Sequence, residues 1–479
     1  MDLNLKIIHI DFKGAPVKLS YLKEVVRFLK KYGLDGLLLE YEDMFPYEGK
    51  LSCISRRDAY SKEELEEFLI FCKDENICVI PLIQTFGHLE FLLKQEQFRP
   101  LRENFKYPMT ICPSLEESIS LIKEMIDQVT KLHPNSKWLH IGADEVFDFN
   151  VCQSCKMRDL DKSRIFLEHI VKLAMYVKKK SFQPIIWDDM LRDIDPNLLI
   201  TCNLRDFVEP MIWNYAPVLN LEEEYFNNML SIFPRIWAAS AYKGANGAVQ
   251  QIVSTSVYVK NNQSWVSRIR NSNQSGAGKF IGIALTGWSR FDHFATLCEL
   301  LPASIPCLTL CLQIISTGTF TVDLHEQVSK SLGFPELIPW EPLIKCVDPA
   351  CVLFFPGFEI YQGLSGWYLL TCEMNQLLNS DYLNGWMSKY HRKNLIANNA
   401  TVECLLKQLE SLHNRMINWK SIFEKNFQNA LIDSAVEEWF ACNINHKITK
   451  LLKLIRQGNQ LIALGDCVFD RTKFVAGDC

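Results

Sequence analysis

Leu5-Lys6-Ile7-Ile8-His9-Ile10-Asp11 is a short run of mostly branched apolar residues that ends on a carboxylate. Such a run is typical of a buried β-strand. Seven further runs of the same kind follow, and they cover residues 36–40, 79–83, 138–141, 185–187, 211–213, 235–239 and 281–286. Because most of these runs are continuously apolar rather than alternating, we expect the strands of a parallel sheet that is covered on both faces.

The segments between these runs have the period of amphipathic helices, and two of them begin with a helix start signal. Ser61-Lys62-Glu63-Glu64 and Ser114-Leu115-Glu116-Glu117 each match a capping box. Eight strand–helix units over about three hundred residues favour an α/β fold of the (β/α)8 TIM barrel type. Asp11-Phe12-Lys13-Gly14 lacks the G-x-G-x-x-G loop of a dinucleotide-binding sheet, which disfavours that alternative.

The character of the sequence changes after Gly318. We assign residues 1–318 to the barrel, the proline-containing residues 319–359 to an irregular linker, and residues 360–479 to a mainly helical C-terminal region. Residues 435–455 carry an apolar stripe at helical spacing. This stripe predicts packing against the barrel or against a second copy of the chain, so a homodimer is possible.

Composition excludes several classes of function. The 479 residues are 48% hydrophobic and 22% charged, which indicates a folded chain with a large core. The net charge of −5 lacks the basic excess of a general nucleic-acid binder. No apolar run approaches the ~18–20 residues of a membrane span, so we expect no association with nucleic acid or membrane.

The seventeen cysteines bear on the compartment in which the protein works. Strand-like sequence begins at Leu5, which leaves no room for a secretory signal peptide. An odd number of cysteines without such a signal predicts reduced thiols that are mostly buried as small apolar groups. We therefore expect a location in the cytoplasm, the nucleus or both.

Carboxylates and aromatic residues follow the expected strands, at the barrel end where active sites of this fold lie. A pocket lined by carboxylates and aromatic rings suits carbohydrate. Sugar rings have apolar faces that lie on indoles, and they have hydroxyl edges that need fixed acceptors. Trp187, Trp213 and Trp288 stand at strand ends and are predicted to form the walls of a pocket, whereas Trp237 lies inside a strand and belongs to the core.

Asp144-Glu145 is the most specific feature of the strand ends. Successive residues of a strand point to opposite faces, so both acids can serve one sugar only if the chain turns between them. Adjacent negative charges favour retention of one proton. We assign that proton to Glu145 as a general acid, with Asp144 near the substituent at the sugar's second carbon.

His140-Ile141-Gly142-Ala143-Asp144-Glu145 resembles the H-x-G-[AG]-D-E signature of glycoside hydrolase family 20, the β-N-acetylhexosaminidases. Two further stretches also resemble elements of that family: Thr85-Phe86-Gly87-His88 is similar to its T-P-G-H element and Asp43-Met44-Phe45-Pro46 to its acidic turn. The likeness extends over the whole expected barrel. It implies a glycoside hydrolase that removes terminal non-reducing β-linked GlcNAc or GalNAc from a glycoconjugate or oligosaccharide.

The resemblance also implies a retaining, substrate-assisted mechanism through an oxazolinium intermediate, in which the sugar's acetamido oxygen is the nucleophile. Glu145 is then the acid and base, and Asp144 stabilises the acetamido N–H. The remaining residues that the resemblance places around the substrate are Tyr242 at the acetamido oxygen, His88 with Asp43 or Glu42 as partners of hydroxyl groups, and His140 of the signature itself.

The chain departs from the family pattern at two strand ends. An arginine that commonly follows the first strand is missing, so Lys13 or Asp11 must take its place in hydroxyl recognition. The usual Trp-x-Glu after the last strand reads Trp288-Ser289-Arg290. Both differences leave the choice between gluco and galacto substrates open.

Three alternatives stay open at this point. Cys152-x-x-Cys155 offers two of the four ligands of a zinc site, and free thiols are the simpler interpretation, so we expect no metal and no cofactor. The barrel could bind glycans without catalysis. It could also be a different glycosidase whose acid and nucleophile include Asp188, Asp189 or Glu209.

Overall fold

The computed structural model describes residues 3, 5–274, 279–341 and 352–464. The chain divides into two compact units, which are described separately. The first consists of the described part of Met1–Ile344 with Ala350–Phe358 and Ala430–Ala435. The second consists of Glu359–Asn429 and the described part of Val436–Cys479.

The first unit is built on a closed barrel of parallel strands, in which each strand pairs with its neighbour in sequence and β8 returns to β1. The TIM barrel expected from the sequence is therefore confirmed. The strands are β1 (Leu5–Asp11), β2 (Gly36–Glu40), β3 (Cys78–Leu82), β4 (Trp138–His140), β5 (Gln183–Trp187), β6 (Glu209–Trp213), β7 (Arg235–Lys243) and β8 (Lys279–Gly287).

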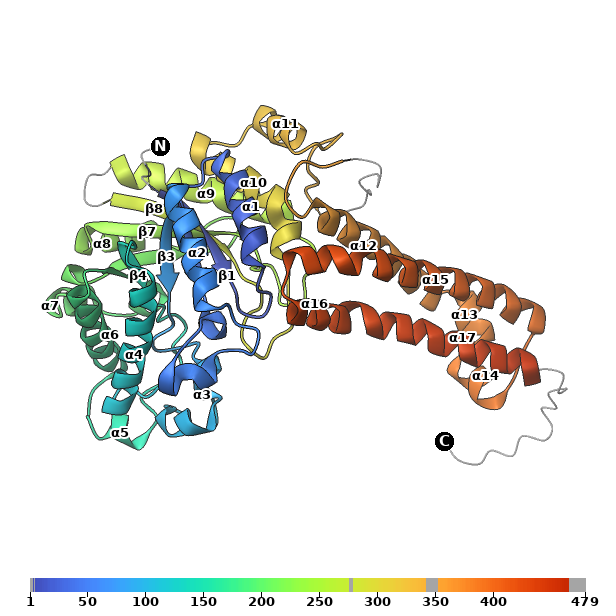
Figure 1. The fold of residues 1–479 in the computed structure, drawn as a ribbon, viewed down its shortest axis with the longest axis horizontal. Helices are drawn as coiled ribbons and strands as arrows, with labels where there is room; N and C mark the ends of the chain where they lie inside the picture. Colours follow the sequence, from blue (N-terminus) through green and yellow to red (C-terminus); the bar gives the residue numbers. More distant parts are fainter. Residues whose placement is uncertain (1–2, 4, 275–278, 342–351, 465–479) are drawn as a thin grey trace. The chain divides into compact units, whose positions relative to one another are not determined.

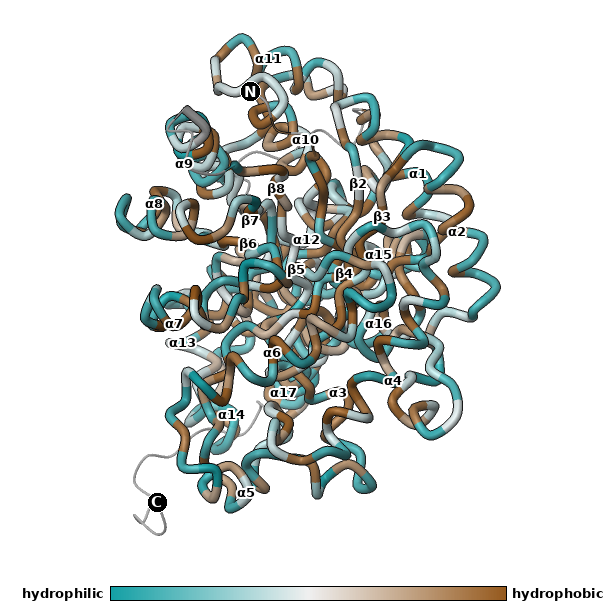
Figure 2. Tube along the Cα trace, turned by 90° about the vertical axis from the view of Figure 1, so that its left-hand side faces the viewer, coloured by the Kyte–Doolittle hydropathy of each residue, from teal (hydrophilic) through white to brown (hydrophobic). Residues whose placement is uncertain are grey.

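Helices surround this barrel (Figure 1). The outer ones are α1 (Leu19–Lys30), α2 (Lys62–Asp74), α4 (Glu116–Leu132), α6 (Lys162–Lys179), α8 (Glu223–Ile232), α9 (Thr255–Gln274) and α10 (Leu301–Thr317). Short helices occupy the loops after three strands: α3 (Glu90–Leu93), α5 (Gln153–Lys156) and α7 (Pro196–Thr201). The outer edges of α1, α2 and α8 are mostly hydrophilic in Figure 2, as amphipathic helices on a covered sheet require.

The two capping boxes predicted from the sequence can be compared with the first turns of α2 and α4. Ser61 and Glu64 form both reciprocal hydrogen bonds, so the box that opens α2 is confirmed. The second box is wrong, because α4 begins after Leu115 without a side-chain cap. The Ser114 hydroxyl instead lies 3.0 Å from the Cys155 sulfur.

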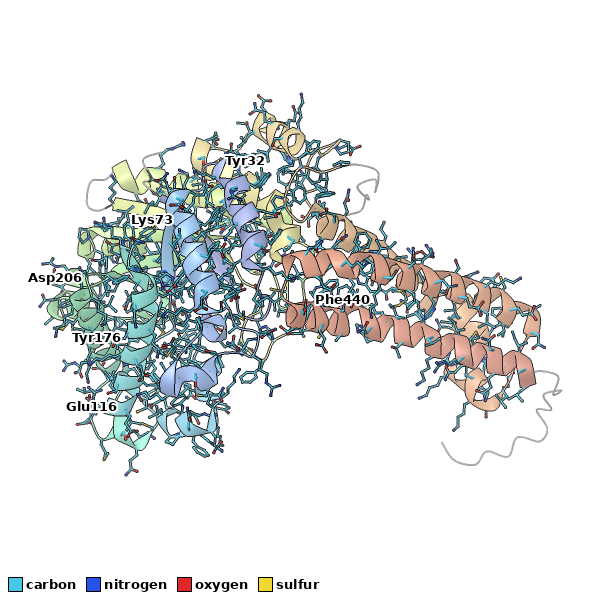
Figure 3. All side chains as sticks on the ribbon, viewed as in Figure 1. Tyr32, Lys73, Glu116, Tyr176, Asp206 and Phe440 are labelled. Carbon is cyan, nitrogen blue, oxygen red and sulfur yellow. The ribbon has the colours of Figure 1, made fainter. Side chains whose placement is uncertain are left out.

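The outer layer is joined by polar contacts between neighbouring helices. Glu116 of α4 pairs with Lys172 of α6 at 2.7 Å, and the Tyr176 hydroxyl of α6 donates to Asp127 of α4 at 2.7 Å. Figure 3 labels Glu116 and Tyr176 among the side chains of this surface. Both contacts join α4 to α6, and the Glu116–Lys172 ion pair contributes little free energy because it is exposed.

The interior of the barrel is filled by apolar side chains from all eight strands, including Ile7, Leu38, Ile80, Trp138 and Trp237. Glu209 begins β6 at the amino-terminal end of the barrel. Its carboxylate accepts hydrogen bonds from the indoles of Trp138 and Trp237 at 3.0 and 2.9 Å, and Arg235 pairs with its other oxygen at 2.8 Å. Trp237 is therefore a core residue, as predicted.

The segment expected to be an irregular linker is partly helical, because α11 occupies Val322–Ser331. Thr321 caps this helix, and its hydroxyl accepts from the Leu324 N–H. Part of the expected linker, residues 342–351, lies outside the described residues.

The second unit is helical. Its elements include α12 (Phe358–Leu378), α13 (Asp381–Trp386), α14 (Lys389–Asn394), α15 (Asn399–Ala430), α16 (Asp433–Phe440) and α17 (His446–Leu464), and a π-helical turn at Ala441–Asn445 joins the last two. Trp367 of α12 packs on Trp419 of α15 with ring centroids 4.9 Å apart. None of the described helices is long and apolar enough to cross a membrane.

Candidate active site

A cavity of about 200 Å³ opens at the carboxyl ends of the barrel strands. Residues from at least five strand ends line it, and they are Lys13, Glu40, Gln84, His88, Asp144, Glu145, Trp187, Trp213, Tyr215, Gly244, Ala245, Trp288, Arg290 and Phe291. Eight of these were predicted from the sequence: both acids, the three tryptophans, His88, Lys13 and Arg290. The cavity is small beside the ~300–1,000 Å³ of sites that hold drug-sized ligands.

The chain turns sharply after β4, as the use of both acids requires. Gly142, Ala143 and Glu145 have φ angles of +64°, +70° and +48°, in the left-handed region that non-glycine residues seldom adopt. Gly142 must be glycine for a second reason, because a Cβ there would lie 2.0 Å from Oε1 of Gln84. The strain is typical of functional sites, where surrounding contacts hold such a turn in place.

Gly87 of the Thr85–His88 element has a role of its own in this turn. A Cβ on Gly87 would lie 2.7 Å from the backbone oxygen of Asp144, so only glycine lets the two loops approach this closely. The approach brings His88 against both acids. Its Nε2 lies 3.5 Å from Asp144 Oδ2 and 3.3 Å from Glu145 Oε2.

The electrostatics of the acids differ from the prediction. Burial raises the pKa of Asp144, although His88 opposes this effect. The hydrogen bond from His88 lowers the pKa of Glu145, whose side chain is 46% exposed. The expectation that Glu145 keeps the shared proton in the free protein is therefore wrong: water solvates Glu145, whereas Asp144 lies inside. Although burial opposes it, Asp144 and Glu145 raise the pKa of His88 to about 10, so His88 is cationic at neutral pH.

Asp189 holds the second acid in place. Its carboxylate accepts from the Glu145 backbone N–H at 2.8 Å and from the Trp213 indole at 3.0 Å. Burial and the neighbouring Asp144 raise the pKa of Asp189 to about 7. One carboxylate thus fixes both the acid's backbone and one wall of the cavity, a role that no spacing in the sequence indicates.

Cationic groups stand on the opposite side of the cavity. Lys13 follows β1, and Glu40 ends β2 beside it. Although burial opposes the shift, Lys13 and the hydrogen bond from His9 at 2.9 Å hold the pKa of Glu40 below its usual range. Arg290, which follows β8, lies against Gly14, where a Cβ would be 1.9 Å from its Nε. Arg290 therefore occupies the space next to Lys13, at the strand end where the usual arginine is missing.

The aromatic walls come from the ends of β5, β6 and β8. Trp187 and Trp288 have ring centroids 6.1 Å apart, and Trp213 stacks on Tyr215 at 5.2 Å. The indole N–H of Trp187 is buried and has no hydrogen-bond partner among the described residues, so it is available to a ligand. Tyr215 was missed by the sequence reasoning, although it stands only two residues after the predicted wall residue Trp213.

Tyr242 does not line the cavity, in contrast to the prediction. Its side chain is fully buried, and its hydroxyl donates to the backbone oxygen of His9 at 3.3 Å. The register between β7 and β8 shifts between Ala241 and Lys243, next to this tyrosine, so the strand is irregular at the residue that the family resemblance placed in the pocket. Tyr215 is the tyrosine that reaches the acids' side of the site.

Four other predicted residues lie behind the cavity wall. Asp11 accepts the backbone N–H groups of Lys13 and Ser289 at 2.7 and 2.8 Å, so it joins the ends of β1 and β8. Glu42 contacts Lys13 at 3.5 Å. The other two residues are Asp43, which lies 3.7 Å from the Lys94 ammonium, and His140, whose Nδ1 accepts the Gly142 N–H at 3.0 Å.

Two carboxylates of the rival glycosidase scheme are engaged elsewhere. Asp188 binds Arg192 through both oxygens at 2.9 Å and also accepts from the Tyr225 hydroxyl at 2.7 Å. Glu209 lies at the other end of the barrel with its two indoles. Neither residue lines the cavity, so a mechanism that uses them as acid or nucleophile is disfavoured.

Comparison with known proteins agrees with this site. A family model described as "Glycosyl hydrolase family 20, catalytic domain" matches residues 42–294. The chain is 35% identical to hexosaminidase D of Homo sapiens over 96% of this chain and 95% of that protein, and 39% identical to hexosaminidase D of Bos taurus over 70% and 98%. A β-N-acetylhexosaminidase structure from Bacteroides fragilis, 15% identical, shares the fold with a TM-score of 0.50 over 69% of this chain and 70% of that one.

The fold, the acid-lined cavity and these matches make the protein a glycoside hydrolase. The chain belongs to glycosyl hydrolase family 20.

Proposed function

We propose that the protein is a retaining exo-β-N-acetylhexosaminidase, which removes terminal β-linked GlcNAc or GalNAc by substrate-assisted catalysis. The observation that carries the proposal is the joint position of Asp144 and Glu145 on one histidine at the mouth of a tryptophan-lined cavity. The names of the human and bovine relatives support the same activity. A cavity of about 200 Å³ suits one terminal sugar rather than the interior of a chain.

In the proposed mechanism the acetamido oxygen attacks the anomeric carbon, and the glycosidic oxygen leaves as Glu145 protonates it. Asp144 accepts the acetamido N–H as positive charge develops on the oxazolinium ring. Glu145 then takes a proton from water, which opens the ring with the original anomeric configuration. Since the nucleophile belongs to the substrate, it acts at high effective molarity, and no second protein carboxylate is needed below the ring.

Substrate binding would reverse the two pKa shifts of the free protein. A sugar over Glu145 removes water from its half-exposed carboxyl, which favours the protonated acid. The acetamido N–H gives Asp144 a hydrogen-bond donor, which favours its anion. The acid and the anion would therefore take their roles in the complex rather than before it.

The nucleophile is tested by inhibition and product analysis. A thiazoline analogue of the oxazolinium ring should inhibit strongly, and the first product should be the β-anomer. An α-anomer, or equal rates on 2-acetamido and 2-hydroxy glycosides, would refute the proposal. Absence of hydrolysis together with tight binding of the thiazoline would favour the alternative of a glycan-binding barrel without catalysis.

Tyr215, rather than Tyr242, is proposed to donate to the acetamido oxygen. Tyr215 lines the cavity, whereas the Tyr242 hydroxyl is used by the His9 carbonyl. Tyr215→Phe should lower kcat by about 10- to 100-fold, the usual cost of a lost donor to developing charge. Tyr242→Phe is the matched control and should leave kcat within about twofold, since it removes a hydrogen bond outside the cavity.

We further propose that the enzyme works in the cytoplasm or nucleus. The thirteen described cysteines are all free, which suits a reducing compartment. Fractionation of cells that produce the untagged protein tests this location.

A further inference from the structure

Three cysteines and a glutamate meet beside the loop that carries the two acids. Cys112 lies 3.5 Å from the sulfur of Cys152 and 3.7 Å from that of Cys155. Glu103 Oε2 lies 3.1 Å from the Cys155 sulfur. The four potential ligand atoms all lie within 4.8 Å of one another.

These separations fit a tetrahedral metal rather than a disulfide. Sulfur atoms that bind one zinc at about 2.3 Å in a tetrahedron are about 3.8 Å apart. A disulfide requires about 2.05 Å. The observed distances of 3.5 and 3.7 Å are close to the first value.

The cluster is built, because its members are buried and oriented by the backbone. Glu103, Cys112 and Cys155 are at most 2% exposed. The Cys155 N–H donates to the Cys152 sulfur at 3.3 Å, which orients that sulfur. Glu103 accepts from the Val151 and Cys152 N–H groups through Oε1, which leaves Oε2 directed at the sulfurs.

The donor set of the cluster also suits a soft cation. A metal that binds here would displace the thiol protons, and the thiolates and the carboxylate would then be paired with the cation. Thiolates select zinc over the hard cations magnesium and calcium. Four protein ligands leave no open position, which is the arrangement of a structural rather than a catalytic zinc.

We propose that Glu103, Cys112, Cys152 and Cys155 hold a structural zinc ion that fixes the loop bearing Asp144 and Glu145. Cys152 and Cys155 end that loop at α5, whereas Glu103 and Cys112 belong to the loop that follows β3. The β3 loop is tied to His88's element, since the Ile111 N–H donates to the Phe86 oxygen at 3.1 Å. The short helices α3 and α5 of these two loops lie at the same end of the barrel in Figure 1.

The zinc would therefore connect the two segments that must meet for His88 to contact both acids. The zinc would add to contacts that already join these segments, such as the hydrogen bond from Asn104 to Asp148 at 2.7 Å and the packing of Phe86 on Phe149 with ring centroids 5.3 Å apart. The residues that bind it are positioning residues, because none of them lines the cavity.

The test is zinc content of the full-length protein, purified under reducing conditions without chelator and measured by mass spectrometry. We expect about one zinc per chain. Cys112→Ser and Cys155→Ser should each lose most of the metal, whereas the matched control Cys72→Ser, which alters a buried thiol of α2, should retain it. These measurements use no substrate, so their outcome is independent of the proposed activity.

Two further measurements on the wild-type protein decide the proposal when a variant fails to fold. Cobalt that replaces zinc in the wild-type protein should give the sulfur-to-metal charge-transfer absorption of a tetrahedral thiolate site. Removal of the metal by chelator should speed hydrogen exchange in residues 144–152. Wild-type protein without zinc, or with a disulfide between Cys112 and either partner, would overturn the site. Zinc release that leaves the exchange of 144–152 unchanged would overturn its positioning role.

Discussion

Both ends of the barrel hold carboxylates beside tryptophans. The two ends differ in how many hydrogen bonds those carboxylates already accept within the protein. Glu209, at the amino-terminal end, has two indole donors and an arginine within 3.0 Å. At the carboxyl end, Asp144 and Glu145 share one histidine and face a cavity.

This difference separates a structural carboxylate from a reactive one. A carboxylate whose lone pairs are all occupied stabilises the fold and has nothing left for a ligand. Two carboxylates that share one histidine and face a cavity keep the capacity to exchange a proton and to accept a new donor. The residue types are the same at both ends, so only their surroundings assign the roles.

The largest expected effect is at the carboxyl end of the barrel, where the cavity opens. Glu145→Gln removes the proton donor and should lower kcat by about 10²- to 10⁴-fold, with the smaller loss on substrates whose leaving group needs no protonation. Steady-state rates on an aryl glycoside and on a disaccharide measure the difference. Equal losses on both substrates would show that Glu145 is not the acid. The melting temperature should stay within a few degrees because the side chain is half exposed.

At the amino-terminal end of the barrel we expect a mutation to change the free energy of unfolding instead of the rate. Glu209→Ala leaves two buried indole N–H groups without an acceptor, which should cost about 2–5 kcal/mol of unfolding free energy. Denaturant titration measures this loss. The rate per folded molecule at low temperature should stay within about threefold, since the catalytic end keeps its contacts. A large loss of rate with unchanged stability would reverse the roles that we assign to the two ends.

A smaller effect is expected from a mutation in the turn after β4, which brings both acids to the cavity. Gly142→Ala places a Cβ against Gln84, the residue that donates to Asp144 at 3.1 Å, and it adds backbone strain. We expect a loss of about 10-fold in kcat/KM and about 1–3 kcal/mol of stability. Gly49→Ala is the matched control, because Gly49 also has positive φ but open space around it. Gly49→Ala should lower the stability but leave kcat/KM unchanged.

The smallest effect is a shift in pH dependence. His88 is cationic and lowers the pKa values of both acids, so His88→Gln should raise both. Two limbs of the pH profile of kcat/KM should therefore move to higher pH by about one unit. One is the limb that requires ionised Asp144, and the other is the limb that requires protonated Glu145. His133→Gln, a buried histidine that contacts Tyr41, should leave both limbs in place. A shift toward lower pH would contradict the assignment.

Much of the site was predictable because barrel chemistry follows strand ends. The eight apolar runs placed Asp144, Glu145, His88 and the three tryptophans at one end, and the structure brings all six together. Tyr242 was assigned to the pocket by the family resemblance, which does not show that its hydroxyl donates to the His9 carbonyl outside the cavity. Asp189, Gln84 and Tyr215 were missed because their importance lies in contacts with residues far away in sequence.

The sequence by itself determined the barrel, the pair of acids and the family. Hydrophobic periodicity and a short motif are local properties, so they can be read without knowing which residues meet. Tertiary structure alone decided which acid is solvated, which tyrosine faces the cavity and which carboxylate is structural. It also brought Glu103 and Cys112 to the Cys152–Cys155 pair. Burial and pairing set these properties, and both arise between segments that the linear chain keeps apart.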